Sequence, residues 1–254
     1  MKFTRAIVRA PADTLVKGLT TSDLGKPDYE KARIQHLAYI DALRELGLEV
    51  MMLPMDDRFP DSVFVEDTAV ITPEFGIITR PGAVTRRDEI VEMEGVMRRF
   101  FLDVELIESP GTVDGGDVLQ AGNRFYVGIS KRTNANGAGQ LAEKLKKHGF
   151  EVIILPVEKS LHLKSDVAWL GNNTMIVTSA FANYPDFNDY KKIVIPEEEK
   201  YAANCVMING TVLVAEGFPA ARELIEKEGF KTKALDVSEF RKLDGGLSCL
   251  SLRF

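Results

Sequence analysis

The chain has 254 residues, a length between one ordinary domain and two. Apolar residues make up 45% of it, which excludes a disordered chain because this much apolar surface can offset chain entropy. The formal net charge of −6 disfavours a general nucleic-acid binder. No apolar run approaches the roughly 18–20 residues of a membrane span, and the start of the chain is no signal segment. Two cysteines cannot staple a fold of this size, so we expect a cytoplasmic protein in a reducing compartment.

Five β-branched runs recur along the chain, and a polar segment follows each of them and opens into a second apolar run. The spacing of about 40–54 residues predicts five repeated units. Such a period favours radial or solenoidal repetition. A closed ring would protect the strand edges, and in a ring the polar segments would converge near the axis. The first runs are 50–54, 104–107, 152–156, 193–196 and 233–237. The polar segments are 60–67, 111–117, 161–165, 202–205 and 244–249.

Helical patterns lie between these runs. We predict helices over residues 27–46, 86–101, 133–148 and 219–229, three of which end at a glycine that suits a helix C-terminus. Strands that alternate with helices indicate an α/β architecture. Because composition shows no linker and no low-complexity tract, residues 1–254 are predicted to form a single domain.

The two cysteines differ in their surroundings. Cys205 lies in an apolar run, which is typical of a packed, inert thiol. Cys249 follows Gly245 and Gly246, and flanking glycines let the backbone approach a ligand closely while the thiol stays accessible. Cys249 is therefore the better candidate for a nucleophile, provided that a base lies nearby.

Of three histidines, only one lies at a repeat point. His36 is in the first predicted helix, and His148 is at a helix end, where a cation suits the helix dipole. A lone histidine is more often structural than catalytic. His162, however, occupies the polar point of the third unit, equivalent to that of Cys249, and this equivalence favours a catalytic role.

Carboxylates gather at the same repeat points. If these carboxylates only cap helices or accept from turn amides, they need no further explanation. If several of them converge in an interior site, however, burying their charges costs free energy unless a cationic partner is present. A guanidinium, whose planar donors match carboxylates in pairs, is the most suitable partner. The residues therefore indicate a Cys–His–Asp site that binds a cation. These carboxylates are Asp61, Glu66, Asp67, Asp114 and Asp117.

Arg86 and Arg132, each at the start of a predicted helix, are either surface residues or a pair that holds a carboxylate. The sequence has no zinc-ligand spacing, no phosphate-binding glycine motif and no Gly-x-Ser-x-Gly. We therefore predict neither a metal nor an organic cofactor.

Together these segments resemble the dimethylarginine dimethylaminohydrolase (dimethylargininase) family of the guanidino-modifying superfamily. The resemblance extends from about residue 10 to residue 254. Each segment alone is a weak marker, but their order and spacing are highly specific. The resemblance implies a pentein fold, a five-bladed α/β propeller with a central active site. The matching segments are 18–20, 59–67, 79–82 with 86–87, 132–134, 161–164, 202–205 and 244–249.

The resemblance also implies a reaction, the hydrolysis of methylated arginines to citrulline and dimethylamine or methylamine. It makes Cys249 the nucleophile, His162 the acid and then the base, and Asp114 the acid that orients His162. The remaining implied roles concern substrate binding, and a homodimer is implied by the resemblance alone. Asp61, Glu66 and Asp67 would bind the guanidinium, Arg86 and Arg132 the α-carboxylate, and the carbonyls of Leu19 and Leu243 the α-amino group, under a gating loop over 14–26.

Two departures and two alternatives accompany this interpretation. Asp114 stands where some bacterial members carry Glu, and the preference among methylation states is not carried by the motifs. The nearest alternative is an arginine deiminase or a related arginine or citrulline hydrolase of the same superfamily. Deiminases, however, resemble one another in a His-x-Asp motif, and here the position two after His162 is Lys164. A non-catalytic pentein, such as a ribosome anti-association factor, would not need Cys249, His162 and Asp114 together.

Overall fold

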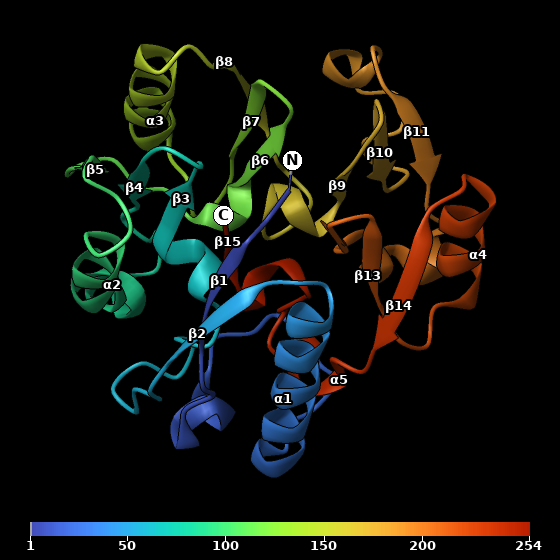
Figure 1. Cartoon of the computed structure of the whole chain (residues 1–254), viewed down its shortest axis with the longest axis horizontal. Helices are drawn as coiled ribbons and strands as arrows, with labels where there is room; N and C mark the ends of the chain where they lie inside the picture. Colours follow the sequence, from blue (N-terminus) through green and yellow to red (C-terminus); the bar gives the residue numbers. More distant parts are fainter. Residues whose placement is uncertain (1) are drawn as a thin grey trace.

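In residues 2–254, which the computed structural model describes, the strands form five three-stranded sheets. The sheets stand around a common centre like the blades of a propeller (Figure 1). The predicted fivefold repetition is therefore confirmed.

The strands of each sheet lie close together in the sequence, except that the last strand joins the first sheet. In chain order the first three sheets are β15 (Leu252–Arg253), β1 (Arg5–Arg9) and β2 (Glu49–Leu53); β3 (Ala69–Ile71), β4 (Gly76–Ile78) and β5 (Val104–Leu106); and β6 (Val118–Ala121), β7 (Arg124–Ile129) and β8 (Glu151–Pro156). The last two are β9 (Val167–Gly171), β10 (Thr174–Val177) and β11 (Lys191–Val194); and β12 (Val206–Ile208), β13 (Thr211–Ala215) and β14 (Lys231–Leu235).

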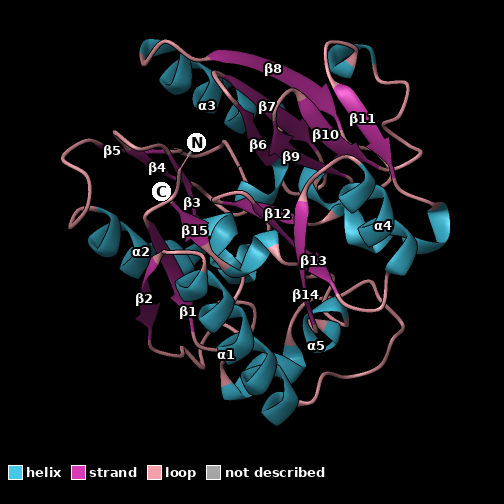
Figure 2. Cartoon of the chain, turned by 45° about the vertical axis from the view of Figure 1, so that its right-hand side comes forward, coloured by secondary structure: helices cyan, strands magenta, loops and turns pink. Residues whose placement is uncertain are grey.

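Every sheet has the same internal order. Its middle strand pairs antiparallel with one neighbour and parallel with the other. A parallel pair needs a crossover connection, and the crossovers lie on the outside of the strands (Figures 1 and 2). None of the helices in residues 2–254 combines the length and apolar character that a bilayer crossing requires. The crossovers are α1 (Tyr29–Glu45), α2 (Ile90–Met97), α3 (Ala135–Lys147), the 3-10 turn η6 (Pro185–Phe187) and α4 (Pro219–Lys227), and a short α5 (Ser238–Arg241) follows β14.

The helix ends follow from local side-chain chemistry. Asp28 accepts a hydrogen bond from the Lys31 amide at the start of α1, and Asn134 does the same for Gly137 at the start of α3. One predicted helix differs from the structure: residues 86–101 divide into a 3-10 turn η3 (Val84–Glu89) and α2. A 3-10 turn brings residues i and i+3 into line, and here it aligns the buried ion pair of Arg86 and Glu89.

The ring closes between the two ends of the described chain. Strand β15 pairs antiparallel with β1, through Ala6 with Arg253 and Ile7 with Leu252. The first sheet therefore contains both an early and a late segment of the sequence. This pairing gives the first sheet its third strand and covers an edge of β1 that would otherwise be free.

Five hydrophobic clusters fill the spaces between the blades, and each is shared by two successive sheets. For example, Ile7 of β1 packs in one cluster with Ile78 of β4, and Tyr126 of β7 in another with Met175 of β10. Cys205 is buried in the cluster between the fourth and fifth sheets, which confirms its prediction as a packed thiol. Burial on this scale supplies the main favourable term of folding.

His36 is a side chain of α1 whose burial gives stability a pH dependence in the acid range. The ring is 1% exposed, contacts the edge of Phe240, and has no hydrogen-bond partner for Nε2 in the described residues. Burial lowers the pKa of His36 to about 4. Since the folded-state pKa lies below the ordinary value, the unfolded chain binds a proton first as pH falls.

We therefore expect the free energy of unfolding to fall by about 2–3 kcal/mol between pH 7.5 and 4.5 through this residue alone. His36→Leu should remove that part of the pH dependence while it changes stability little at pH 7.5. Urea unfolding of both proteins at the two pH values measures the difference. If the difference in free energy of unfolding between His36→Leu and the parent is the same at both pH values, this assignment is contradicted.

Candidate active site

Five short 3-10 turns meet at the centre of the ring, each just before the first strand of the next sheet. The contacts between them run in a chain from η8 to η2, η4, η5 and η7. The predicted convergence of the polar segments near the axis is therefore confirmed. The turns are η2 (Val65–Thr68), η4 (Gly115–Asp117), η5 (Leu163–Ser165), η7 (Glu197–Ala203) and η8 (Ser248–Leu250), and they carry or adjoin Asp67, Asp114, His162, Asn204 and Cys249 respectively.

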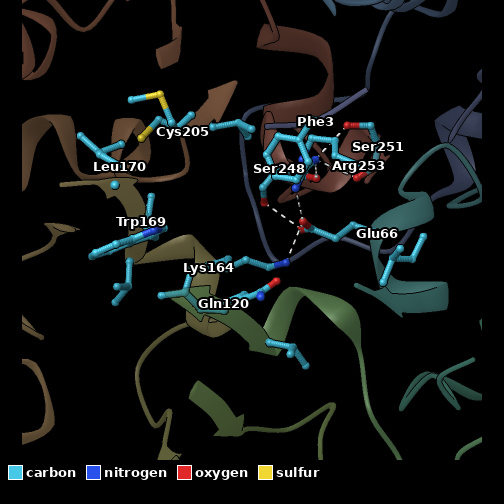
Figure 3. A pocket seen from close by; sticks show the side chains of 18 of the residues that line it. Phe3, Glu66, Gln120, Lys164, Trp169, Leu170, Cys205, Ser248, Ser251 and Arg253 are labelled. Carbon is cyan, nitrogen blue, oxygen red and sulfur yellow. Dashed lines mark hydrogen bonds and ion pairs between the residues drawn. The ribbon is translucent and has the colours of Figure 1, made fainter. Parts of the chain in front are cut away.

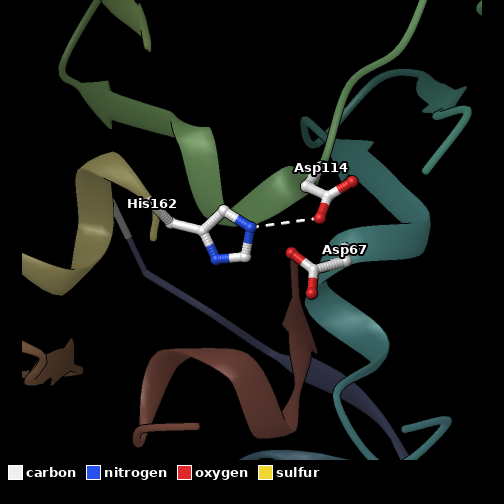
Figure 4. A group of neighbouring side chains, drawn as sticks. All are labelled: Asp67, Asp114 and His162. Atoms are coloured by element: carbon white, nitrogen blue, oxygen red, sulfur yellow. Dashed lines mark hydrogen bonds and ion pairs between the residues drawn. The ribbon is translucent and has the colours of Figure 1, made fainter. Parts of the chain in front are cut away.

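His162 and Asp114 form a buried pair at the starts of η5 and η4. The ring donates from Nε2 to Asp114 Oδ2 across 3.1 Å, and Asp67 lies beside the pair (Figure 4). Burial by itself would lower the pKa of His162, but the charges of Asp67, Asp114 and Asp117 and the hydrogen bond to Asp114 raise it to about 9. Although burial would raise the pKa of Asp114, its hydrogen bond to His162 and the imidazolium charge lower it. The pair therefore holds a proton on the imidazole at neutral pH.

The carboxylate oxygens of this cluster are already bonded within the protein. Asp114 Oδ1 accepts from the Gly82 amide at 2.8 Å. Asp67 Oδ1 accepts from the Gly116 amide at 2.9 Å, and its Oδ2 from Arg86 at 2.6 Å. Ligand atoms of Asp67, Asp114 and His162 lie within 4.8 Å of one another, a spacing that would also suit a metal ion. Because each carboxylate is held by donors of the chain, this geometry suits an acid–imidazole pair, and the absence of a metal stays a prediction.

Asp117 has a structural role that the sequence did not reveal. Its buried carboxylate accepts from Ser130 at 2.6 Å, from Thr133 at 2.7 Å and from the Leu163 amide at 3.0 Å. Leu163 directly follows His162, so Asp117 fixes the turn that aims the imidazole. The only signal in the sequence was its place at the second repeat point.

Cys249 lies in η8 after a turn of two glycines. A side chain at Gly245 would overlap the Phe64 ring, and one at Gly246 would overlap the Asn204 amide, so both positions require glycine. The Gly246 amide donates to Cys249 Sγ at 3.5 Å. Burial and the negative charges of Glu66 and Asp67 raise the pKa of Cys249 to about 12. Without a bound cation the nucleophile candidate is therefore a neutral thiol.

Arg86 is buried and serves several acceptors at once. Nε and Nη2 donate to the two oxygens of Glu89 at 3.0 and 2.8 Å, and Nη1 donates to Asp67 at 2.6 Å. Nη2 also donates to the Phe64 carbonyl at 2.9 Å. The pKa of Arg86 stays well above its usual value because the charges of Glu89 and Asp67 outweigh burial. The observed role of Arg86 is therefore to orient Asp67 and to compensate Glu89, and its implied role as a ligand of a carboxylate stays a prediction.

Asp61 connects Arg86 and Arg132 to the segment that carries Leu19. Its carboxylate accepts from the Leu19 amide at 2.9 Å. Burial raises the pKa of Asp61, against the opposing charges of Arg86 and Arg132. Arg132 is half-buried, and its backbone packs on Gly82. The two arginines predicted to hold a carboxylate therefore lie within electrostatic reach of the same aspartate.

Residues 19–21 lie against residues 242–244. Thr20 donates its hydroxyl proton to the Lys242 carbonyl at 2.8 Å, and the Thr21 amide donates to Asp244 at 2.5 Å. Leu19 is 39% exposed, whereas the Leu243 side chain is buried. The two residues predicted to accept from an α-amino group thus belong to neighbouring segments at one rim of the site.

Glu66 lines a cavity of about 550 Å³ together with Lys164, Ser248 and Arg253 (Figure 3). Its carboxylate accepts from Lys164 at 2.7 Å, from Arg253 at 3.0 Å and from the Ser248 hydroxyl at 2.8 Å. Two cations and a hydroxyl therefore occupy its oxygens. The implied role of Glu66 as a guanidinium ligand stays a prediction, and its observed role is to join η2 to η5, η8 and β15.

The sequence is similar to a family model and, more closely, to individual proteins of one family. Residues 54–188 match the family model described as arginine deiminase. The chain is 49% identical over 253 residues to N(G),N(G)-dimethylarginine dimethylaminohydrolase of Pseudomonas aeruginosa, covering 99% of this chain and 100% of that one. It is 38% identical over 259 residues to the enzyme of the same name from Streptomyces coelicolor, covering 100% and 98%.

Among solved structures, the C249S mutant of the Pseudomonas aeruginosa enzyme in complex with citrulline superimposes with a TM-score of 0.98, at 49% identity and full coverage of both chains. The fold is therefore the pentein fold that the resemblance implied. The chain belongs to the dimethylarginine dimethylaminohydrolase family.

The His162–Asp114 geometry predicts a measurable proton affinity. NMR titration of the imidazole should give a pKa of about 9 for His162 in the parent protein. Asp114→Asn removes one charge and weakens the hydrogen bond. The pKa of His162 should therefore fall by about 1 unit or more. His36, distant in the sequence and buried in α1, is the internal control whose titration should not change. An unshifted His162 in the variant would show that Asp114 does not govern its protonation.

Proposed function

We propose that the chain hydrolyses Nω-methylated L-arginines, asymmetric dimethylarginine and monomethylarginine, to L-citrulline and dimethylamine or methylamine. The observation that carries the proposal is the convergence of Cys249 with a protonated His162–Asp114 pair at the axis of the ring. Two further observations support it: the full-length likeness to dimethylarginine dimethylaminohydrolases, and the citrulline bound in the similar structure.

The proposed reaction begins with the substrate cation. A guanidinium beside Cys249 adds positive charge where Glu66 and Asp67 disfavour the thiolate, so binding favours loss of the thiol proton. The thiolate then attacks the guanidinium carbon and forms the C–S bond. Since the free thiol is neutral, the nucleophile is activated chiefly in the complex.

His162 performs the two proton transfers that follow. As an imidazolium it protonates the leaving amine while the C–N bond breaks, which leaves an S-alkylthiouronium on Cys249. The neutral imidazole then removes a proton from water, the water oxygen bonds to the same carbon, and the C–S bond breaks. The second proton of the water leaves as the urea carbonyl of citrulline forms, and it restores the Cys249 thiol, so that the enzyme ends with a thiol and an imidazolium. The net products are citrulline and the amine, which takes up from solvent the proton that the thiol released when the substrate bound.

We assign the remaining contacts to the amino-acid end of the substrate. Arg86 and Arg132 hold the α-carboxylate, and the carbonyls of Leu19 and Leu243 accept from the α-amino group. The support for this assignment is that both arginines lie near Asp61, whose carboxylate holds the Leu19 amide. We assign Asp67 to the guanidinium, with Glu66 behind it. Asp61, which the resemblance also implied as a guanidinium ligand, accepts from the Leu19 amide and therefore stands beside a residue assigned to the amino-acid end.

An arginine deiminase is the alternative that the family model keeps open. In such enzymes a second carboxylate is expected two residues after the histidine, where it grips the unmethylated nitrogens. Here Lys164 occupies that position and pairs with Glu66 at 2.7 Å. A site that grips the guanidinium from one side leaves room for methyl groups on the other, which favours the methylated substrate.

We further propose that residues 1–254 act as one catalytic domain in the cytoplasm. The support is that each sheet shares its core with its neighbours and that both cysteines are free. A homodimer is proposed from the family resemblance only.

Turnover of two substrates tests the proposed function. The parent protein should form citrulline from asymmetric dimethylarginine at least about tenfold more efficiently, in kcat/KM, than from arginine. Cys249→Ser should bind the substrate but release no citrulline, since an alcohol is a far weaker nucleophile than a thiolate. Efficient conversion of arginine with poor conversion of the methylated substrate would instead establish the deiminase alternative.

A pair of glycine substitutions tests the placement of His162. A Cβ at Gly116 would lie 2.6 Å from His162 Nδ1, whereas one at Gly139 in α3 has no atom within 4 Å. Gly116→Ala should lower kcat by about 10²-fold, because small displacements of a catalytic group are costly. Gly139→Ala should leave kcat unchanged and raise stability slightly through helix propensity. Equal activity of the two variants would argue against the proposed role of His162.

A further inference from the structure

Asn204 is the residue at the one repeat point for which no role has been assigned. It directly follows η7 and is 6% exposed. The other four turns contribute Asp67, Asp114, His162 and Cys249 to the proposed reaction. Asn204 occupies the equivalent position in the remaining turn, so its side chain reaches the same axial region.

The contacts of Asn204 fix the orientation of its amide. Oδ1 accepts a hydrogen bond from the Ser248 backbone amide at 2.9 Å. Because a backbone N–H can only donate, the atom that it meets must be the oxygen. Nδ2 then faces Cys249 Sγ at 3.9 Å, on the donor side of the amide.

A second donor approaches the same sulfur. The Gly246 amide donates to Sγ at 3.5 Å, and a Cβ at Gly246 would lie 2.8 Å from Asn204 Nδ2. The amide of Asn204 therefore lies directly on the glycine backbone that carries the other donor. Two N–H groups, one from η7 and one from the glycine turn, converge on the thiol.

The other charged groups near the sulfur explain why such donors matter. Glu66 and Asp67 oppose a thiolate, whereas Lys164 favours it through its charge. Tyr201, from η7, lies nearby as a neutral phenol whose own pKa is raised by burial. Before the substrate binds and after citrulline forms, oriented N–H groups add to the positive charges of Lys164 and the His162 imidazolium in stabilising negative sulfur.

We propose that Asn204 is a catalytic residue, whose amide donates to the Cys249 thiolate while its oxygen holds the Ser248 backbone in place. It stabilises the sulfur when the thiol loses its proton and again when the C–S bond breaks and the electron pair returns to sulfur. This proposal rests on the proposed role of Cys249 as the nucleophile.

The chain offers variants that separate the donor from the structural contact. Asn204→Asp keeps an oxygen for the Ser248 amide but replaces the donor with a second acceptor. Asn204→Leu removes donor and acceptor without adding charge. Tyr201→Phe is the matched control, since the Tyr201 hydroxyl holds the same glycine turn through the Gly245 carbonyl at 2.8 Å and makes no hydrogen bond to the sulfur.

The test is alkylation of the full chain by iodoacetamide between pH 7 and 10, with the Cys249 peptide quantified by mass spectrometry. Asn204→Asp should slow alkylation about tenfold or more at every pH, which corresponds to a thiolate about 1 pKa unit harder to form. Asn204→Leu should also slow it, and Tyr201→Phe should change it less than about twofold. In turnover, kcat should fall for both Asn204 variants while KM stays within about twofold of the parent.

The proposal is overturned if both Asn204 variants are alkylated at the parental rate, or if Tyr201→Phe loses as much alkylation rate as they do. If circular dichroism shows that Asn204→Asp is unfolded, the alkylation rates of Asn204→Leu and Tyr201→Phe are compared instead, and equal rates overturn the proposal. Alkylation needs no substrate, so a parent that alkylates normally but forms no citrulline would contradict the proposed function, and with it the catalytic role of Asn204. The alkylation rates of the variants would then test only the hydrogen bond from Asn204 to the Cys249 thiolate.

Discussion

The pairing of β15 with β1 is the interaction on which the rest of the structure depends. Only two residue pairs define it, yet it joins the first and fifth units of the ring and holds the turn that carries Cys249. Arg253 of β15 strengthens this junction by donating to the Ser248 and Ser251 carbonyls at 3.0 and 2.7 Å and to Glu66 at 3.0 Å. The position of the thiol is therefore fixed by the closure of the ring and not by its neighbours in sequence alone.

Charge balance is the second constraint on the site. Several buried carboxylates crowd the axis, and a buried charge is tolerated only where partners and hydrogen bonds compensate its desolvation. Arg86 compensates Asp67 and Glu89, while Lys164 and Arg253 compensate Glu66. His162 takes up a proton for the same reason. The chemistry proposed for the site thus uses a charge state that the fold itself requires.

Much of the fold and part of the site could be predicted from the sequence. The period of apolar runs and polar segments gave five units, since each unit repeats the same strand, crossover and turn. Cys249 was identifiable as a candidate because it follows two glycines, and His162 because it occupies the equivalent repeat point. The polar partners were harder to predict: Glu66 faces Lys164 and Arg253, and Arg86 pairs with Glu89, because orientation within a 3-10 turn depends on neighbouring blades. Asp117 and Asn204 act through backbone amides far along the chain, a contact that leaves no periodic signal.

The sharing of each core between two blades has a consequence for biosynthesis. A blade that leaves the ribosome early contributes residues to two hydrophobic clusters. The residues of the neighbouring blades that complete these clusters are translated later. Strand β15, which follows the strands of all the other described blades, completes the last of these surfaces. A nascent chain therefore cannot bring Cys249 to the centre of the ring until β15 pairs with β1, so the proposed chemistry becomes available only in the folded molecule.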